Sequence, residues 1–276
     1  MSTWVHPAGT AAHDGWDVRL PAGAELSYAG VAVRTLSPGE RLELVPDGTE
    51  RMLVPLDGAV EARVDGSTHV LGRAGDVMEA APDVLYLPID RRCDLRARDA
   101  GCRLLIASAP ADEVHAVQLL PARDIPVEVR GEPPARRRVR DLGGEHVLRA
   151  QRLLVCEVLT PAGGWSSYPP HKHDAASPGT ESVLEEIYYY EIRRSGPPAA
   201  HDRPVGYHRT FASDERELDV LAEVRSGDTV LVPYGWHGPC MAPPGYAMYY
   251  LNVMAGPGPE RTWQVTFHPD YDWTRR

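Results

Sequence analysis

The sequence contains no run approaching about 18 consecutive apolar residues, so no segment predicts a transmembrane helix. It also has no excess of positive charge, because 39 Asp and Glu residues outnumber 29 Lys and Arg residues and give a formal net charge of -10. No overall positive field is therefore available to attract nucleic acid or an anionic membrane. The first residues lack the basic start and apolar stretch of a secretory signal peptide. We expect a cytoplasmic protein that binds neither nucleic acid nor a membrane.

Cysteine and lysine are also scarce. The four cysteines, Cys93, Cys102, Cys156 and Cys240, have no metal-ligand spacing, which favours reduced thiols in the core over a cysteine metal site or a disulfide framework. Lysine occurs only once, as Lys172, between two histidines.

Proline and glycine, in contrast, are abundant. The 26 Pro and 25 Gly residues leave little room for long helices and favour many short strands joined by turns. Dipeptides such as Asp57-Gly58 are typical of these turns. Period-two alternation and short apolar runs predict strands at residues 31–36, 51–56, 59–64, 84–87, 104–107, 153–159, 186–192, 205–211, 229–232 and 248–254.

A weak internal repeat indicates a duplicated domain. The segments around Gly75 and Gly227 are alike, each leads into an apolar segment that contains proline, and the two glycines lie 152 positions apart, close to half the chain. Between them, a proline-rich segment carries arginines within residues 136–140, which we interpret as exposed linker surface rather than a substrate site. We predict an N-terminal domain at residues 1–120, an interdomain connection at 121–145 and a C-terminal domain at 146–276.

The strongest chemical signal is the pair His171 and His173. Residues two apart in a strand point to the same face, so both imidazoles can reach one metal ion. Histidines hydrogen-bonded near a turn are the alternative. A later strand places Glu186, Tyr188 and Tyr190 on one face, which suits a polar pocket, while the residues between them face the opposite way and suit packing.

A third segment, residues 227–237, predicts a strand followed by a turn that delivers His237. A His-x-His pair with a glutamate, followed by Gly-Asp, Pro-x-Gly and a histidine, resembles the two signature motifs of the cupins, small β-barrels that bind a divalent metal. The resemblance implies His171, His173, Glu186 and His237 as the ligands. It also implies an all-β bicupin fold with two double-stranded β-helix (jelly-roll) barrels, the first of which lacks metal ligands.

Longer stretches around these residues are similar to a narrower family. Residues 164–174, 185–189 and 244–257 closely resemble the 5-deoxyglucuronate isomerases of bacterial myo-inositol catabolism, and the similarity is specific over residues 125–273. This resemblance implies the conversion of 5-deoxy-D-glucuronate to 5-dehydro-2-deoxy-D-gluconate, an aldose-ketose isomerisation. One departure is His208, where that family tends to have glutamine.

Such a reaction moves a proton between adjacent carbons while a negative oxygen develops, and a Lewis-acidic metal stabilises that oxygen directly. Three neutral histidines and one carboxylate leave a six-coordinate divalent ion with about two open positions for the adjacent oxygens of an α-hydroxy aldehyde.

The candidates for the base are Glu185, Lys172, His208 and the tyrosines. Glu186 is a poor candidate because a carboxylate bound to a metal is a weak base. Lys172 should face away from the metal. Its side chain has two alternative roles, a salt bridge to Asp174 or Glu185 and a contact with the sugar acid.

Substrate binding requires a partner for the substrate carboxylate. Arg209 is a candidate, because a guanidinium group pairs with a carboxylate bidentately. The candidates to line the pocket are Tyr188, Tyr190, Tyr250 and Asn252, although half of the strand that carries the last two must be core.

We expect one divalent metal ion per chain. Zinc is the first expectation, and the same ligands accept manganese, iron or nickel. The expected partner is a small-molecule sugar acid, and assembly into a homo-oligomer is left open. Two other functions also stay open: a cupin dioxygenase with iron in a similar site, and a non-catalytic cupin that binds a sugar acid without turnover.

Overall fold

Strands joined by turns and loops dominate the chain, and long helices are absent from its described residues, as the density of proline and glycine predicts. The computed structural model describes residues 3–197, 201–213, 216–258 and 261–275. Every segment expected to be a strand lies in a strand, although residues 51–56 and 59–64 share one, and the all-β class is confirmed. In these described ranges the helical elements are two 3-10 helices, η1 (Ala122–Asp124) and η2 (Pro269–Arg275).

The first half of the chain builds a sheet of eight strands. Its order is β2-β3-β8-β5-β7-β9, and β4 pairs with β8 while β6 pairs with β5. The strands are β2 (Val18–Leu20), β3 (Gly30–Leu36), β4 (Arg41–Leu44), β5 (Thr49–Val64), β6 (Ser67–Gly72), β7 (Val84–Leu87), β8 (Cys93–Pro110) and β9 (Gln118–Leu120).

The long strand β5 differs from the prediction of two strands joined by a turn at Asp57-Gly58. β5 runs through these residues, and its pairing with β8 shifts register on both sides of them, which marks a bulge. Gly58 has a φ of +66°, and a Cβ atom there would lie 2.2 Å from the carbonyl oxygen of Gly101. The dipeptide therefore bends a strand instead of ending it.

The second half forms two sheets, which we call the C-terminal sheets. The seven-stranded sheet has the order β1-β20-β17-β22-β12-β11-β10, and the other has the order β19-β18-β21-β14-β23 with β13 on β21. The first comprises β1 (Val5–His6), β10 (Val127–Arg130), β11 (Arg137–Asp141), β12 (Leu154–Thr160), β17 (Glu185–Arg194), β20 (Thr229–Val232) and β22 (Tyr246–Ala255). The second comprises β13 (Trp165–Ser166), β14 (His171–Lys172), β18 (Gly206–Ser213), β19 (Arg216–Val224), β21 (Trp236–Met241) and β23 (Thr266–Phe267), and a separate hairpin joins β15 (Asp174–Ser177) to β16 (Glu181–Val183).

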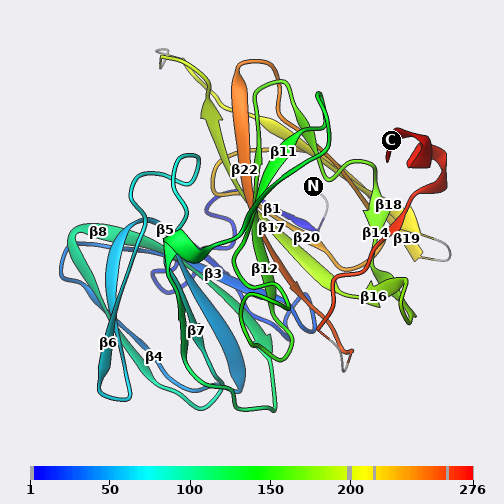
Figure 1. Ribbon diagram of the computed structural model, residues 1–276. Coiled ribbons are helices and arrows are strands. Elements are labelled where there is room, and N and C mark those ends of the chain that lie inside the picture. The colour runs from blue at the N-terminus through cyan, green and yellow to red at the C-terminus, as the bar shows by residue number, and fades with distance from the viewer. Residues whose placement is uncertain (1–2, 198–200, 214–215, 259–260, 276) are drawn as a thin grey trace.

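The borders of the two halves differ from the predicted domains in two places. The N-terminal strand β1 pairs with β20, so the start of the chain lies on a C-terminal sheet (Figure 1). The segment at residues 121–145, expected as a connection, supplies β10 and β11, because β11 continues the sheet by pairing with β12. Val139 is buried at that pairing, and the Pro133-Pro134 dipeptide only forms the tip of the β10–β11 hairpin. The proline-rich composition therefore marks a hairpin rather than a linker.

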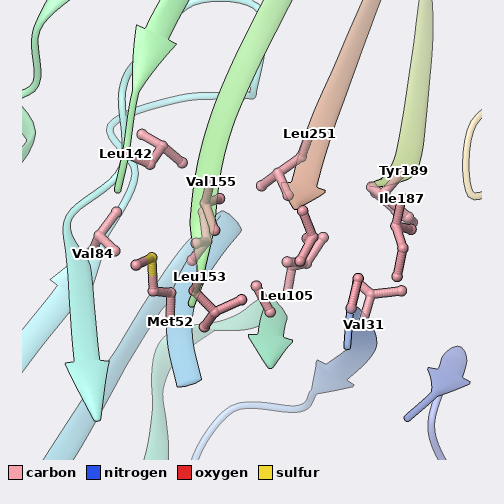
Figure 2. Packing of buried hydrophobic residues seen from close by; sticks show 14 of the residues in the cluster. Val31, Met52, Val84, Leu105, Leu142, Leu153, Val155, Ile187, Tyr189 and Leu251 are labelled. Carbon is pink, nitrogen blue, oxygen red and sulfur yellow. The ribbon is translucent and has the colours of Figure 1, made fainter. Parts of the chain in front are cut away.

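The two halves share one hydrophobic core. Side chains of β3, β5 and β8 pack against those of β12, β17 and β22, as Figure 2 shows for Val31, Met52 and Leu105 on one side and Val155 and Leu251 on the other. All five are at most 1% exposed. Burial of this apolar surface holds the halves together as one body.

A buried ion cluster crosses the same interface. Glu157 on β12 accepts hydrogen bonds from Arg73 of the first half, from Arg140 on β11 and from the Tyr249 hydroxyl. The side chains of Glu157 and Arg73 are fully buried and that of Arg140 is 3% exposed. The single carboxylate therefore bridges two arginines, offsets one of their two positive charges and reduces their repulsion in the core.

Strand β17 separates this interface from the space between the C-terminal sheets. Ile187 and Tyr189 belong to the core shared with the first half, while Tyr188 and Tyr190 belong to the cluster between the C-terminal sheets. The predicted alternation of β17 is thus confirmed, and it directs Glu186 toward the same interior as the two tyrosines.

Candidate metal centre

Three of the four predicted metal ligands meet between the C-terminal sheets. His173 follows β14, Glu186 lies on β17 and His237 lies on β21. Glu186 Oε2 is 3.1 Å from His173 Nε2 and 3.2 Å from His237 Nε2. All three residues are at most 2% exposed, and their ligand atoms lie within 4.8 Å of one another. Strands from both C-terminal sheets are needed to bring them together.

Backbone carbonyl groups fix the orientation of the histidine rings. Each Nδ1 atom lies within hydrogen-bond distance of a carbonyl oxygen, which requires Nδ1 to donate and leaves a lone pair on Nε2. The acceptors are Pro169 (3.2 Å) for His171, Leu184 (2.9 Å) for His173 and Gly235 (3.1 Å) for His237.

This arrangement attracts a positive charge to the centre of the cluster. With those tautomers, two Nε2 lone pairs face a carboxylate oxygen, and His237 Nε2 has no hydrogen-bond partner in the described part of the chain. A proton on His173 Nε2 also relieves this repulsion: burial opposes the charged form of His173, but the hydrogen bond and charge of Glu186 outweigh it and raise the pKa of His173. Burial likewise opposes the charge of Glu186, yet the two histidines lower the pKa of its carboxyl group. The donor set therefore fits a divalent cation.

His171 lies beside this cluster rather than in it. It pairs with His237 across β14 and β21, and their ring centroids are 4.5 Å apart. Its ring centroid is 6.4 Å from that of His173. Burial, with the charge of His237 adding to it, keeps the pKa of His171 well below its usual value. His171 is therefore a neutral imidazole next to the other three groups.

A cavity of about 210 Å³ reaches Glu186 and His171. The predicted pocket residues that line it are Tyr188, Tyr250 and Asn252. Asn252 is 3% exposed, and its Nδ2 is an unpaired donor among the described residues. The cavity is further lined by Arg130, Arg137, Val139, Val158, Ser167, Trp263, Val265 and Phe267.

His208 and Tyr190 lie between the C-terminal sheets but do not line this cavity. The Tyr190 hydroxyl is 2.6 Å from His208 Nδ1, and Thr210 Oγ1 is 2.7 Å from His208 Nε2. His208 is fully buried, and its ring packs 4.8 Å from the ring of Tyr188. Burial, with the charge of His237 adding to it, lowers the pKa of His208 to about 3. The residue is therefore neutral inside the folded protein.

Glu185 lies on the opposite face of β17, so its expected role as a base needs correction. Its carboxylate accepts hydrogen bonds from the backbone N–H groups of Ser27 (2.9 Å), Tyr28 (2.6 Å) and Ala29 (3.1 Å) in the first half. The alternation that directs Glu186 into the space between the C-terminal sheets directs Glu185 toward the first half of the chain. Its position indicates an interdomain contact.

Lys172 and Arg209 also point away from the cluster. Lys172 Nζ donates to Asp174 (2.7 Å) and Glu181 (2.8 Å), so one of the two expected salt bridges forms and Glu181 takes the place of Glu185. Arg209 donates to Asp219 and to the Val220 carbonyl on the neighbouring strand β19. Neither side chain lines the cavity, because each alternates with an inward-facing histidine.

Sequence reasoning missed Arg130 and Arg137 as cavity residues. The prediction of an exposed linker surface covers Arg137 and does not mention Arg130, whereas the β10–β11 hairpin places both side chains on the cavity with Tyr250 and Asn252. The residues on either side of the Pro133-Pro134 turn alternate over a short stretch, and this pattern predicts a hairpin that would have placed both arginines on paired strands.

Comparison with known proteins gives consistent matches. The KduI/IolB family matches residues 5–274. A 5-deoxy-glucuronate isomerase of Geobacillus kaustophilus is 37% identical over 277 residues, which cover 99% of this chain and 95% of that protein. A 5-deoxy-glucuronate isomerase of Listeria monocytogenes is 35% identical over 252 residues, which cover 90% of this chain and 88% of that protein.

Solved structures agree with these matches. The crystal structure of an IolB-like protein from Salmonella typhimurium LT2 covers 100% of both chains, with a TM-score of 0.87 and 32% identity. An oxalate decarboxylase of Lactobacillus farciminis covers 97% of this chain and 89% of its own, with a TM-score of 0.63 and 12% identity, and it shows a shared fold alone. Within the described residues, no helix has the length and apolar character that crossing a membrane requires.

Proposed function

This chain belongs to the KduI/IolB family, and from that premise we propose that it is a metal-dependent isomerase that converts 5-deoxy-D-glucuronate to 5-dehydro-2-deoxy-D-gluconate. The observation that carries the proposal is the meeting of two imidazole Nε2 atoms with the Glu186 carboxylate at a cavity of about 210 Å³. Relatives named 5-deoxy-glucuronate isomerase that match nearly the full length of the chain support the same reaction here.

The proposed metal ligands are His173, Glu186 and His237, with His171 as the fourth. Zinc is our first choice because imidazole and carboxylate ligands suit it, and manganese, iron and nickel accept the same set. A divalent ion held there would act as a Lewis acid on the two adjacent oxygens of an α-hydroxy aldehyde. The carbonyl groups that fix the Nδ1 protons prepare the Nε2 lone pairs for this role.

The cavity residues supply hydrogen-bond donors for the other oxygens of the sugar acid. Burial raises the pKa of Tyr188 and of Tyr250 well above the usual value, so both phenols stay protonated and donate. The Tyr250 hydroxyl is 3.0 Å from Ser167 Oγ, which orients it. The unpaired Nδ2 of Asn252 is a further donor that a substrate oxygen would satisfy.

Proton transfer needs a group that accepts a proton from the carbon next to the carbonyl. Glu185 and Lys172 are engaged elsewhere, and His208 does not line the cavity and has its pKa lowered to about 3, which makes it a weak base. Of the predicted candidates, Tyr188 and Tyr250 are the ones that line the cavity beside Glu186.

The test is an isomerisation assay on purified protein combined with elemental analysis. The wild-type protein should convert the aldose to the ketose without consuming oxygen, and His173→Ala should abolish conversion and lower the bound metal without unfolding the chain. The matched control is His146→Ala, at a histidine whose side chain is 89% exposed. It should keep both the conversion of the aldose and the bound metal. Full activity after verified metal removal would refute the metal role, and stoichiometric oxygen uptake would assign a dioxygenase instead.

A further inference from the structure

Two arginines face each other across the β10–β11 hairpin. Arg130 and Arg137 are directly paired in the antiparallel register, and both line the 210 Å³ cavity together with Glu186 and His171. Like charges at directly opposed positions destabilise an antiparallel pair. An anion held between them would remove that repulsion.

The two arginines differ in the partners that the protein provides. Arg130 forms an ion pair with Glu128 (2.8 Å) and lies 5.5 Å from the ring centroid of Trp263. Arg137 is half-buried and donates to the Ala135 carbonyl (3.1 Å), and it forms no ion pair with any carboxylate in the part of the chain that the structure describes. Burial lowers the pKa of Arg137, and the charge of Arg130 adds to this effect. A guanidinium group stays charged even so, which leaves Arg137 with an unmatched positive charge at the cavity.

We propose that Arg137, with Arg130 beside it, binds the carboxylate of the sugar-acid substrate and thereby determines specificity for an acid over a neutral sugar. The inference rests on the proposed function, because it takes its substrate from there. That substrate carries its aldehyde and its carboxylate at opposite ends of the carbon chain. The cavity offers a matching pair of sites, with Glu186 and His171 for the reacting end and the planar guanidinium fork of Arg137 for the carboxylate.

The path to the cavity supports this assignment. A larger cleft of about 800 Å³ shares Arg130, Arg137 and Phe267 with the inner cavity and is bordered by Trp165 and Trp273. The arginines therefore lie where the outer cleft meets the inner cavity. The chain has a net charge of -10, so an anionic substrate must be attracted locally, and these two residues provide that attraction.

The experiment compares three variants on two substrates. Arg137→Gln removes the charge, Arg137→Lys keeps it without the fork, and Arg136→Gln makes the same change at the exposed neighbouring arginine. The substrates are 5-deoxy-D-glucuronate and its analogue with a primary alcohol in place of the carboxylate. Calorimetric titration of the acid into each protein and elemental analysis of the metal accompany the kinetics.

Arg137→Gln should lower kcat/KM for the acid about 100-fold, chiefly through KM, since one partner of a charged hydrogen-bonded pair is lost. On the neutral analogue it should match the wild-type protein within about twofold, because no carboxylate is present to lose its partner. Arg137→Lys should recover part of the loss, and Arg136→Gln should behave as wild type, with the metal content unchanged throughout.

The outcomes separate this inference from the proposed function. Equal losses on both substrates, or unchanged kinetics and binding of the acid in Arg137→Gln, would overturn the role of Arg137 while the isomerase assignment stands. A wild-type protein that binds the acid through Arg137 without converting it would support the role of Arg137 and remove the isomerase assignment. A wild-type protein that does not bind the acid would overturn both.

Discussion

Removal of the metal should destabilise the fold measurably, because the cluster around Glu186 is arranged for a cation. Chelation leaves a carboxylate that is 1% exposed facing the lone pairs of His173 and His237. An ion that binds only the folded state stabilises it by about 4 kcal/mol when its free concentration is about 1,000 times the dissociation constant. For a chain of this size, 1 kcal/mol corresponds to about 2–4 °C, so the metal should raise the melting temperature by about 10 °C.

The assay is thermal unfolding of metal-free and reconstituted protein, followed by circular dichroism. In Glu186→Gln the metal should no longer raise the melting temperature, because the amide cannot supply the negative charge of the carboxylate. Glu185→Gln is the matched control on the same strand: it should lower stability in both forms through the contacts at residues 27–29, yet keep the metal increment.

Two results would refute this reasoning. One is a melting temperature that does not change when the metal is removed and restored. The other is an equal metal increment in Glu186→Gln and wild type, which would place the ion elsewhere.

Two further predictions concern the buried charges. Glu157→Gln should reduce the free energy of unfolding by about 3–5 kcal/mol, because two buried arginines lose their shared carboxylate; a loss below about 1 kcal/mol in urea unfolding would contradict the ion cluster. His208 has its pKa lowered to about 3 in the folded protein, so protonation of the unfolded chain below about pH 6.5 should cost stability, roughly 2 kcal/mol by pH 5. In His208→Gln this loss between pH 7 and pH 5 should be absent, and an unchanged loss in urea unfolding would show that another group titrates.

Local periodicity determined much of the candidate site. Alternation along one strand is a property of the backbone, so the sequence alone placed Glu186, Tyr188 and Tyr190 on one face. The same argument turned Lys172 away from its histidine neighbours, and Asp174, two positions along, is within reach of its side chain. The density of proline and glycine predicted the all-β class, because it leaves little room for long helices.

Local signals also misled at several points. Asp57-Gly58 has the sequence of a turn, but the partner strand β8 continues past it and holds it as a bulge. The proline-rich segment at residues 121–145 has the composition of a linker, but β12 was available as a partner, so its strands joined the sheet. In both cases a partner strand outside the segment decided whether its backbone groups paired.

The sequence by itself determined which residues share a face, because that depends on a repeat of two within one strand. Only the tertiary structure decided what each face meets. Arg209 and Arg137 are both arginines in alternating segments, yet Arg209 lies against β19 and Arg137 opens onto the cavity, because each orientation depends on the register with a partner strand. Glu185 contacts the first half for the same reason. Strand pairing is a long-range choice, and no pattern within a single strand contains it.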